Sequence, residues 1–173
     1  MNLLLIGMPG CGKTVVGKLL AQAMHKPFCD LDTKIEAEQG RSITEIFAAV
    51  GEAGFRKLET QALASAADMD AVIATGGGIV VRDENLPLLR RAGLVVFLDR
   101  PLADIMADIR TADRPLLADG KERLQLLQKQ RYDRYLAAAD LRIENTASLE
   151  QAVDKILDEV KKYEDYGDQR AEH

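Results

Sequence analysis

The sequence predicts a three-layer α/β sandwich built around a parallel β-sheet. Three observations lead to this fold class. Short, continuous apolar runs alternate with longer segments of helical periodicity, a pattern typical of strands that are covered on both faces and joined by helices. A glycine-rich turn separates the first apolar run from the helical segment that follows it. The chain has 173 residues, a length that suits one domain.

Each expected strand is an apolar run without polar alternation. The runs are residues 3–6, 28–31, 71–74, 94–98 and 141–143. The helical segments between and after them are residues 15–24, 43–50, 52–67, 85–91, 102–109, 121–139 and 149–162. We therefore expect a single domain over residues 1–162. Residues 163–173 are polar and charged, and we expect them to form a frayed tail.

Composition excludes several functional classes. Lys and Arg total 23 against 28 Asp and Glu, a net charge of −5, which argues against a nucleic-acid-binding surface. The longest strongly apolar stretch, residues 94–98, is too short to span a bilayer. The two cysteines, Cys11 and Cys29, form neither a zinc motif nor a secreted disulfide framework. We expect a cytoplasmic monomer without nucleic-acid or membrane partners.

The turn after the first strand has the pattern of a phosphate-binding loop. Residues 7–14 read G-M-P-G-C-G-K-T, which matches G-x-x-x-x-G-K-[ST]. In this motif backbone N–H groups surround a polyphosphate, Lys13 reaches the β and γ phosphates, and the Thr14 hydroxyl can bind Mg²⁺. The structural alternative is a glycine-rich turn with a surface lysine. The residues expected to bind the nucleotide here are Gly10, Cys11, Gly12, Lys13 and Thr14.

The loop alone does not identify the phosphate acceptor, because nucleotide switches and small-molecule kinases share it. A GTPase usually shows N-K-x-D for the guanine base and D-x-x-G for its switch, and neither string occurs. Transfer to a small molecule is therefore favoured. Cys11 lies near a helix N-terminus, which can lower a thiol pKa. We hypothesise that a thiol reagent inactivates the protein and that ATP protects Cys11; the alternative is an inert small residue that fits the loop.

Two carboxylates lie at the end of the second predicted strand. If the strand continues through them, Asp30 and Asp32 point to one side, at the carboxyl edge of the sheet where α/β proteins bind ligands. One could hold Mg²⁺ through water, and the other could accept a hydroxyl proton as general base. The alternative is that Asp32 caps the following helix.

The acceptor pocket is expected to take a small anion with hydroxyl groups. Arg56 and Glu59 are three residues apart on one helix face and can form an ion pair, which would orient the arginine toward a carboxylate. A solvated surface pair is the alternative. Gly76, Gly77 and Gly78 end the third predicted strand, and their missing side chains allow close approach to a ligand; a flexible turn is the alternative.

A lid is expected at residues 111–120, which have no apolar period and lie between two helical segments. Its arginine, Arg114, could neutralise the transferring phosphoryl group, and Arg110 lies just before it. Arg131 and Arg134, three apart on the next helix, could both face one side. Each of these arginines could instead be simply solvated.

Taken together, these segments resemble the shikimate kinase family. The resemblance spans roughly residues 2–145. Its motifs are the phosphate-binding loop, Asp30-x-Asp32, Ile43-x-Glu45-Ile46-Phe47, Gly51-Glu52-x-x-Phe55-Arg56-x-x-Glu59, Thr75-Gly76-Gly77-Gly78 and Arg114-Pro115-Leu116-Leu117. It implies a P-loop, nucleoside-monophosphate-kinase-like fold with five parallel strands in the order 2-3-1-4-5. It also implies ATP-dependent phosphorylation of the shikimate 3-hydroxyl, on the pathway to chorismate and the aromatic amino acids, with Mg²⁺ as cofactor.

The resemblance further implies roles for individual residues. Asp32 would bind shikimate and serve as base, Asp30 would hold Mg²⁺ through water together with Thr14, and Glu59 would hold Arg56 against the shikimate carboxylate. Arg131 aligns with the second carboxylate-binding arginine, although the family's R-x-P-L-Y string reads R-Y-D-R-Y here and Arg134 is a nearby rival. The remaining implied residues are Gly76, Gly77 and Gly78 at the acceptor, Arg110 over adenine, and Arg114 and Lys13 as catalytic cations.

The residues alone leave other functions open. Two pocket arginines and a base would also suit gluconate or another hydroxy acid, so a different small-molecule P-loop kinase is one alternative. A non-catalytic nucleotide-binding module on the same fold is the second.

Overall fold

The structure, a computed structural model, describes residues 1–108 and 120–171. Its strands are β1 (Asn2–Ile6), β2 (Phe28–Asp30), β3 (Val72–Ala74), β4 (Gly93–Asp99) and β5 (Leu141–Glu144). They form one sheet in the order β2-β3-β1-β4-β5, and every neighbouring pair is parallel. The predicted fold class and strand order are therefore confirmed.

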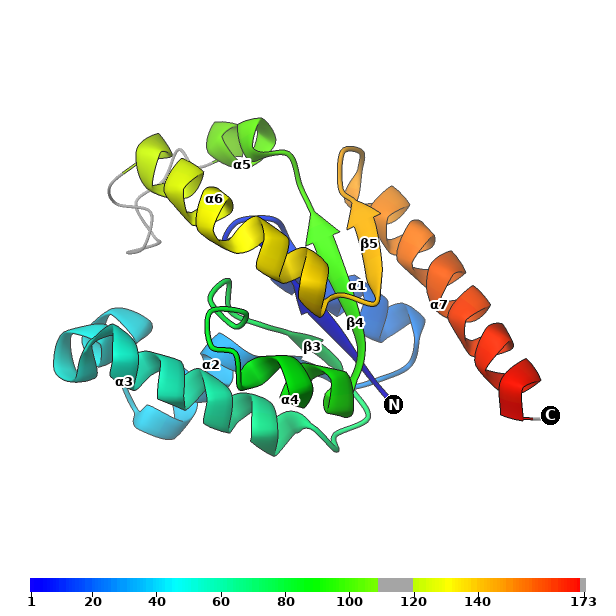
Figure 1. The fold of residues 1–173 in the computed structure, drawn as a ribbon, viewed down its shortest axis with the longest axis horizontal. Coiled ribbons are helices and arrows are strands. Elements are labelled where there is room, and N and C mark those ends of the chain that lie inside the picture. Colours follow the sequence, from blue (N-terminus) through cyan, green and yellow to red (C-terminus); the bar gives the residue numbers. More distant parts are fainter. Residues whose placement is uncertain (109–119, 172–173) are drawn as a thin grey trace.

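The helices connect these strands as parallel pairing requires. They are α1 (Lys13–Ala23), α2 (Leu31–Gln39), α3 (Ile43–Ala66), α4 (Asn85–Ala92), α5 (Leu102–Asp108), α6 (Lys121–Ala138) and α7 (Leu149–Ala171). Helices α1 and α7 pack together on one face of the sheet, whereas α4 and α6 lie on the other, with α3 packed against α4 (Figure 1). This arrangement gives the predicted three layers.

The sheet is the centre of a single hydrophobic core. All five residues of β1 are buried, and so are the residues from Leu94 to Leu98 in β4, because helices cover both faces of these central strands. On one face the Phe97 ring stacks against Tyr135 of α6, with ring centroids 5.1 Å apart. The carboxyl ends of the strands are thereby fixed at one edge, where the candidate site lies.

Helix α2 differs from the sequence-based expectation. The second strand ends at Asp30 rather than continuing through Asp32. The Asp30 carboxylate accepts hydrogen bonds from the backbone N–H groups of Asp32 and Thr33, and this N-cap starts the helix at Leu31. The strand-alternation argument for Asp30 and Asp32 was therefore wrong, and the helix cap is Asp30 instead of Asp32.

Helix α3 contains the two predicted helical segments. They meet at Gly51, whose φ of 69° and ψ of −179° are not helical. The first segment begins at a capping box in which the Ser42 hydroxyl accepts from the Glu45 N–H and the Glu45 carboxylate accepts from the Ser42 N–H. The break at Gly51 redirects the chain before Arg56.

The predicted frayed tail is also corrected. Helix α7 runs to Ala171, well past residue 162. Its apolar stripe, which includes Ile156 and Val160, is buried on the core, and such packing stabilises a helix that polar residues then continue. Polar composition after residue 162 was therefore not evidence of disorder.

Candidate functional site

The phosphate-binding loop joins β1 to α1. Gly10 and Gly12 have φ values of 80° and 98°, which residues with side chains rarely adopt. Helix α1 begins at Lys13 without a side-chain cap, so its first N–H groups are free to bind an anion. The buried Lys13 ammonium donates to the carbonyls of Gly7 and Met8 at 2.8 and 2.9 Å. The loop thus holds a cation and open backbone donors, as a polyphosphate site requires.

Two residues that sequence reasoning missed hold this loop in place. The buried Asn145 side chain, directly after β5, donates to the Cys11 carbonyl at 3.1 Å. Arg100, after β4, donates to the Gly10 carbonyl at 3.3 Å. Both residues follow strands that flank or lie near β1, so the sheet itself brings them to the loop. A polar residue at a strand end was the available signal, although it does not identify the partner.

Cys11 is part of the phosphate-binding loop. Its side chain is fully buried, and the Lys13 ammonium lies 3.7 Å from the sulfur. This burial limits access for a thiol reagent and favours the alternative in which Cys11 fills space in the loop. Cys29, the second free thiol, is half-buried in β2, and burial raises its pKa.

Thr14, in the first turn of α1, contacts Asp30 at the end of β2. The exposed Thr14 hydroxyl donates to Asp30 Oδ2 at 2.7 Å, while Asp30 Oδ1 caps α2. A hydroxyl and a carboxylate therefore stand together beside the phosphate-binding loop. Among the described residues, no group of three or more His, Cys, Asp or Glu side chains could enclose a metal ion. Mg²⁺ commonly takes one or two carboxylates and keeps several water ligands.

Asp32 lies in the first turn of α2 and faces the interior of the site. Its Oδ1 atom is buried and has no hydrogen-bond partner among the described residues. Burial raises the pKa of Asp32, the nearby Asp30 charge raises it further, and Lys13 and Arg56 oppose the rise. An unpartnered carboxylate oxygen with a raised pKa is a suitable acceptor for a hydroxyl proton.

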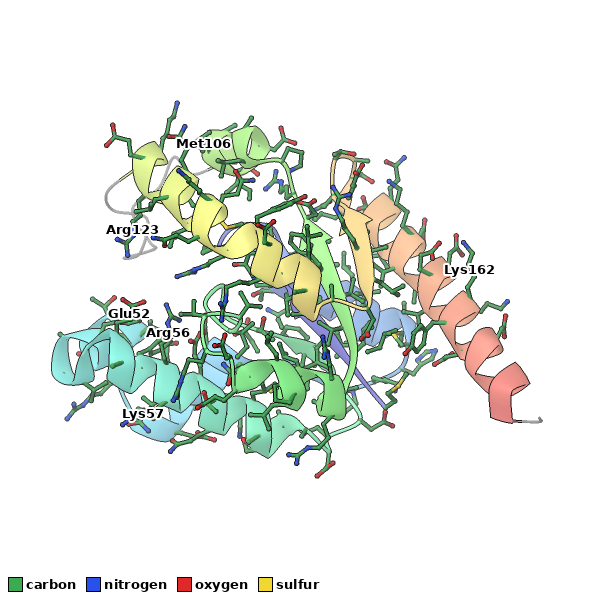
Figure 2. All side chains as sticks on the ribbon, viewed as in Figure 1. Glu52, Arg56, Lys57, Met106, Arg123 and Lys162 are labelled. Carbon is green, nitrogen blue, oxygen red and sulfur yellow. The ribbon has the colours of Figure 1, made fainter. Side chains whose placement is uncertain are left out.

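Arg56 and Glu59 form a buried ion pair on α3. Arg56 Nη1 lies 2.5 Å from Glu59 Oε2, and the two side chains are 6% and 2% exposed. Burial raises the pKa of Glu59, and the Arg56 charge opposes that rise. The alternative of a solvated surface pair is therefore wrong. Figure 2 shows Arg56 and Glu52 on the side of α3 that faces α6, whereas Lys57 lies on the opposite side.

The triple-glycine segment packs directly against these charged groups. A Cβ at Gly76 would lie 2.6 Å from Glu59 Oε1 and 2.8 Å from Asp32 Oδ1. A Cβ at Gly78 would overlap the Arg56 guanidinium, and one at Gly77 would lie 2.7 Å from Pro9. Because real Cβ atoms do not approach so closely, the glycines let Asp32, Glu59 and Arg56 converge. The close-approach interpretation is thus favoured over a flexible turn.

Of the two candidate arginines on α6, only Arg131 lies with this group. Arg131 is buried, and its Nη1 has no hydrogen-bond partner among the described residues. Burial lowers its pKa, the neighbouring Tyr135 opposes this, and the Arg56 charge adds to the lowering. Arg134 instead bonds the carbonyls of Val80 and Val81 and pairs with Asp83.

Tyr135, a further residue that sequence reasoning missed, links α6 to the glycine segment. Its hydroxyl donates to the Gly77 carbonyl at 2.5 Å. Burial raises the pKa of Tyr135, so the hydroxyl keeps its proton and remains a donor. The signal for this residue was an aromatic side chain one helical turn after Arg131.

Some predicted features lie outside the described residues. Arg110, Arg114 and all of the predicted lid except Gly120 belong to this part of the chain. A cavity of about 570 Å³ lies elsewhere, between α6 and β5; Asp99, Tyr132 and Arg142 are among its lining residues, and Lys13, Asp32 and Arg56 are not. No helix in the described ranges is long and apolar enough to cross a membrane.

The described side chains thus form two facing halves. One half is the loop with Lys13, Thr14 and Asp30, which suits a polyphosphate with a divalent cation. The other half is Asp32 together with the buried Arg56 and Arg131 guanidinium groups, which suits an acid that carries a hydroxyl. Lys13 of the first half and Arg56 of the second both oppose the rise in the pKa of Asp32, so the two halves are electrostatically connected.

Comparison with known proteins shows which proteins this chain resembles. A family model described as Shikimate kinase matches residues 9–161. A shikimate kinase of Clostridium botulinum is 41% identical over 162 residues, which cover 93% of this chain and 95% of that protein. The solved structure of shikimate kinase from Acinetobacter baumannii in complex with shikimate matches with a TM-score of 0.88 and 35% identity, covering 94% and 93% of the two chains.

A gluconokinase structure from Sinorhizobium meliloti is also similar. It has a TM-score of 0.62 at 16% identity and covers 97% of this chain. Identity this low supports a shared fold only.

Proposed function

The chain belongs to the shikimate kinase family, and from this premise we propose that its site transfers the γ-phosphoryl group of ATP to the 3-hydroxyl of shikimate. The products are ADP and shikimate 3-phosphate. The observation that carries the proposal is the buried Arg56–Glu59 pair, in which Glu59 meets Asp32 at the space left by the missing side chain of Gly76. We further propose that the protein acts as a cytoplasmic monomer.

The nucleotide half would position the donor. Backbone N–H groups at Gly10, Gly12 and the start of α1 would bind the phosphates, and Lys13 would leave its two carbonyl partners for the β and γ phosphates. Arg114 would contact both substrates and Arg110 would pack over adenine, as the family resemblance implies. Most of the rate enhancement would then come from positioning and charge stabilisation.

Magnesium fits the pair formed by Thr14 and Asp30. Their oxygens are 2.7 Å apart beside the phosphate-binding loop, and hard oxygen ligands of this kind suit Mg²⁺. The Thr14 hydroxyl would bind the ion directly, and Asp30 would hold it through water. When bound, the ion supplies charge neutralisation on the phosphate oxygens.

The acceptor half would hold the acid and remove its proton. Arg56 and Arg131 would bind the carboxylate, with the backbone of residues 76–78 against the ring. The 3-hydroxyl would donate its proton to the open Oδ1 of Asp32 as its oxygen attacks the γ phosphorus. The new O–P bond forms, the bond to the β-phosphate bridging oxygen breaks, and ADP leaves. A base in this role contributes about 10²–10⁴-fold.

The direct test is ADP release from ATP with and without shikimate, against a panel of hydroxy acids that includes gluconate. We expect release only with shikimate. Asp32→Asn should leave the affinity for ATP near normal while turnover falls by about 10²-fold or more. Equal turnover of gluconate would refute the substrate assignment, and an active Asp32→Asn variant would remove Asp32 as the base.

A further inference from the structure

Arg56 has two carboxylate partners that differ sharply in their surroundings. Glu59 is buried at 2% exposure and lies 2.5 Å from Nη1. Glu52, one helical turn earlier, lies 3.3 Å from Nη2 and is 62% exposed. Figure 2 shows Glu52 beside Arg56, on the side of α3 that faces α6. The same guanidinium therefore carries one fixed and one solvent-facing counter-ion.

Glu52 is not needed to orient Arg56. Glu59 already bonds the guanidinium inside the core, and the guanidinium fills the space that a Cβ at Gly78 would take. Glu52 is the first residue after the break at Gly51, and its exposed side chain can change rotamer at little cost. It is thus the partner that an incoming anion can displace.

The two arginines also differ in how their charge is compensated. Arg56 has both glutamates, whereas Arg131 is buried and forms no ion pair within residues 1–108 and 120–165. Together the two guanidiniums would attract any small anion, including inorganic sulfate or phosphate. A nearby negative charge that must be moved aside weakens the binding of every anion. Only an acid with further contacts at Asp32 therefore overcomes the competition from Glu52.

We propose that Glu52 is a displaceable counter-ion that occupies Arg56 in the empty acceptor site and gives way to the substrate carboxylate. This inference rests on the proposed function. Glu52 thereby acts as a specificity-determining residue. It lowers the affinity of the site for anions in general, so that only acids that also offer a hydroxyl to Asp32 bind well. It contributes no group to the phosphoryl transfer itself.

The test is the direction in which the affinity for shikimate changes in the Glu52→Gln variant. The amide keeps the shape of the side chain but removes the charge, so shikimate should bind about two- to five-fold more tightly, the range expected for one partly exposed charge pair. The dissociation constant is measured calorimetrically on the full chain without nucleotide. Inhibition by inorganic sulfate should strengthen by a similar factor, both gains should shrink at high ionic strength, and the KM for ATP should stay unchanged.

Glu84→Gln is the matched control, because Glu84 is an exposed glutamate that pairs with an arginine, Arg82, at 2.8 Å, outside the site. It should leave shikimate and sulfate binding unchanged. Unchanged or weaker shikimate binding in Glu52→Gln would overturn the proposal, and so would an equal gain in the control, which would indicate a general charge effect. If the wild-type protein neither bound nor phosphorylated shikimate, the proposed function would fail instead.

Discussion

Replacing Gly78 by alanine tests whether the triple-glycine segment exists to seat the Arg56 guanidinium. The added Cβ would overlap that group and lie 2.7 Å from its Nη2, whereas carbon and nitrogen atoms normally stay about 3.5 Å apart or more. Because Nη1 and Cζ would lie closer still, the guanidinium must retreat by more than about 1 Å. No unusual backbone angle is involved, since Gly78 is not among the residues with positive φ, so the steric effect is isolated.

The expected cost follows from what the guanidinium does. Loss of a charge-assisted hydrogen bond to the acid is worth about 1.5–3 kcal/mol, so the KM for shikimate should rise about 10- to 150-fold. If the Arg56–Glu59 pair also separates, the free energy of unfolding should fall by about 3–5 kcal/mol, because two buried charges lose their partners. The KM for ATP should change little.

A double-mutant cycle provides the control. In an Arg56→Ala background there is no guanidinium to displace, so Gly78→Ala should add little to the KM for shikimate. The assay is coupled ADP release, with thermal denaturation followed by circular dichroism. A folded Gly78→Ala variant with a wild-type KM, or effects that simply add in the double mutant, would refute the steric explanation.

Three other predictions address the remaining side chains. If Asp32 is the proposed base, turnover should fall as pH drops through its raised pKa, because the protonated carboxyl cannot accept a proton. Asp30→Asn removes one cause of that rise and should move the acid limb of the pH–kcat profile to lower pH, despite slower turnover. Arg131→Met should raise the KM for shikimate about tenfold or more, whereas Arg134→Met should lower only the melting temperature; the reverse pattern would exchange their roles. Asn145→Ala should lower the affinity for ATP about three- to tenfold, because the phosphate-binding loop loses its hydrogen bond from Asn145. An unchanged KM for ATP would show that the loop does not need this contact.

Much of the fold could be predicted because its signals are local. Buried parallel strands require continuous apolar runs, and β1 and β4 were found at nearly their observed limits. The start of α2 could not be predicted in the same way, because the Asp30 side chain can either continue a strand end or cap a helix. That choice is made by its bonds to the N–H groups of Asp32 and Thr33, and sequence periodicity over three residues does not reveal it.

The candidate site likewise contains residues that local motifs predict and residues whose role depends on the tertiary fold. Lys13, Asp32, Arg56 and the glycines belong to short motifs whose chemistry can be read directly. Asn145 reaches a carbonyl 134 positions away in the chain, so its role depends on which strands are neighbours. The choice between Arg131 and Arg134 likewise depended on burial, which their shared helix face does not decide.

The C-terminal end of helix α7 is a suitable attachment point. Its last turns extend beyond the body of the domain, away from α3, α5 and α6 (Figure 1), and residues 161–165 are exposed. A dye, an affinity tag or a surface tether attached at this end would leave the catalytic edge facing free solution. Immobilised enzyme should therefore retain the turnover of the unattached protein, which makes this helix the natural point for anchoring in screening or single-molecule work.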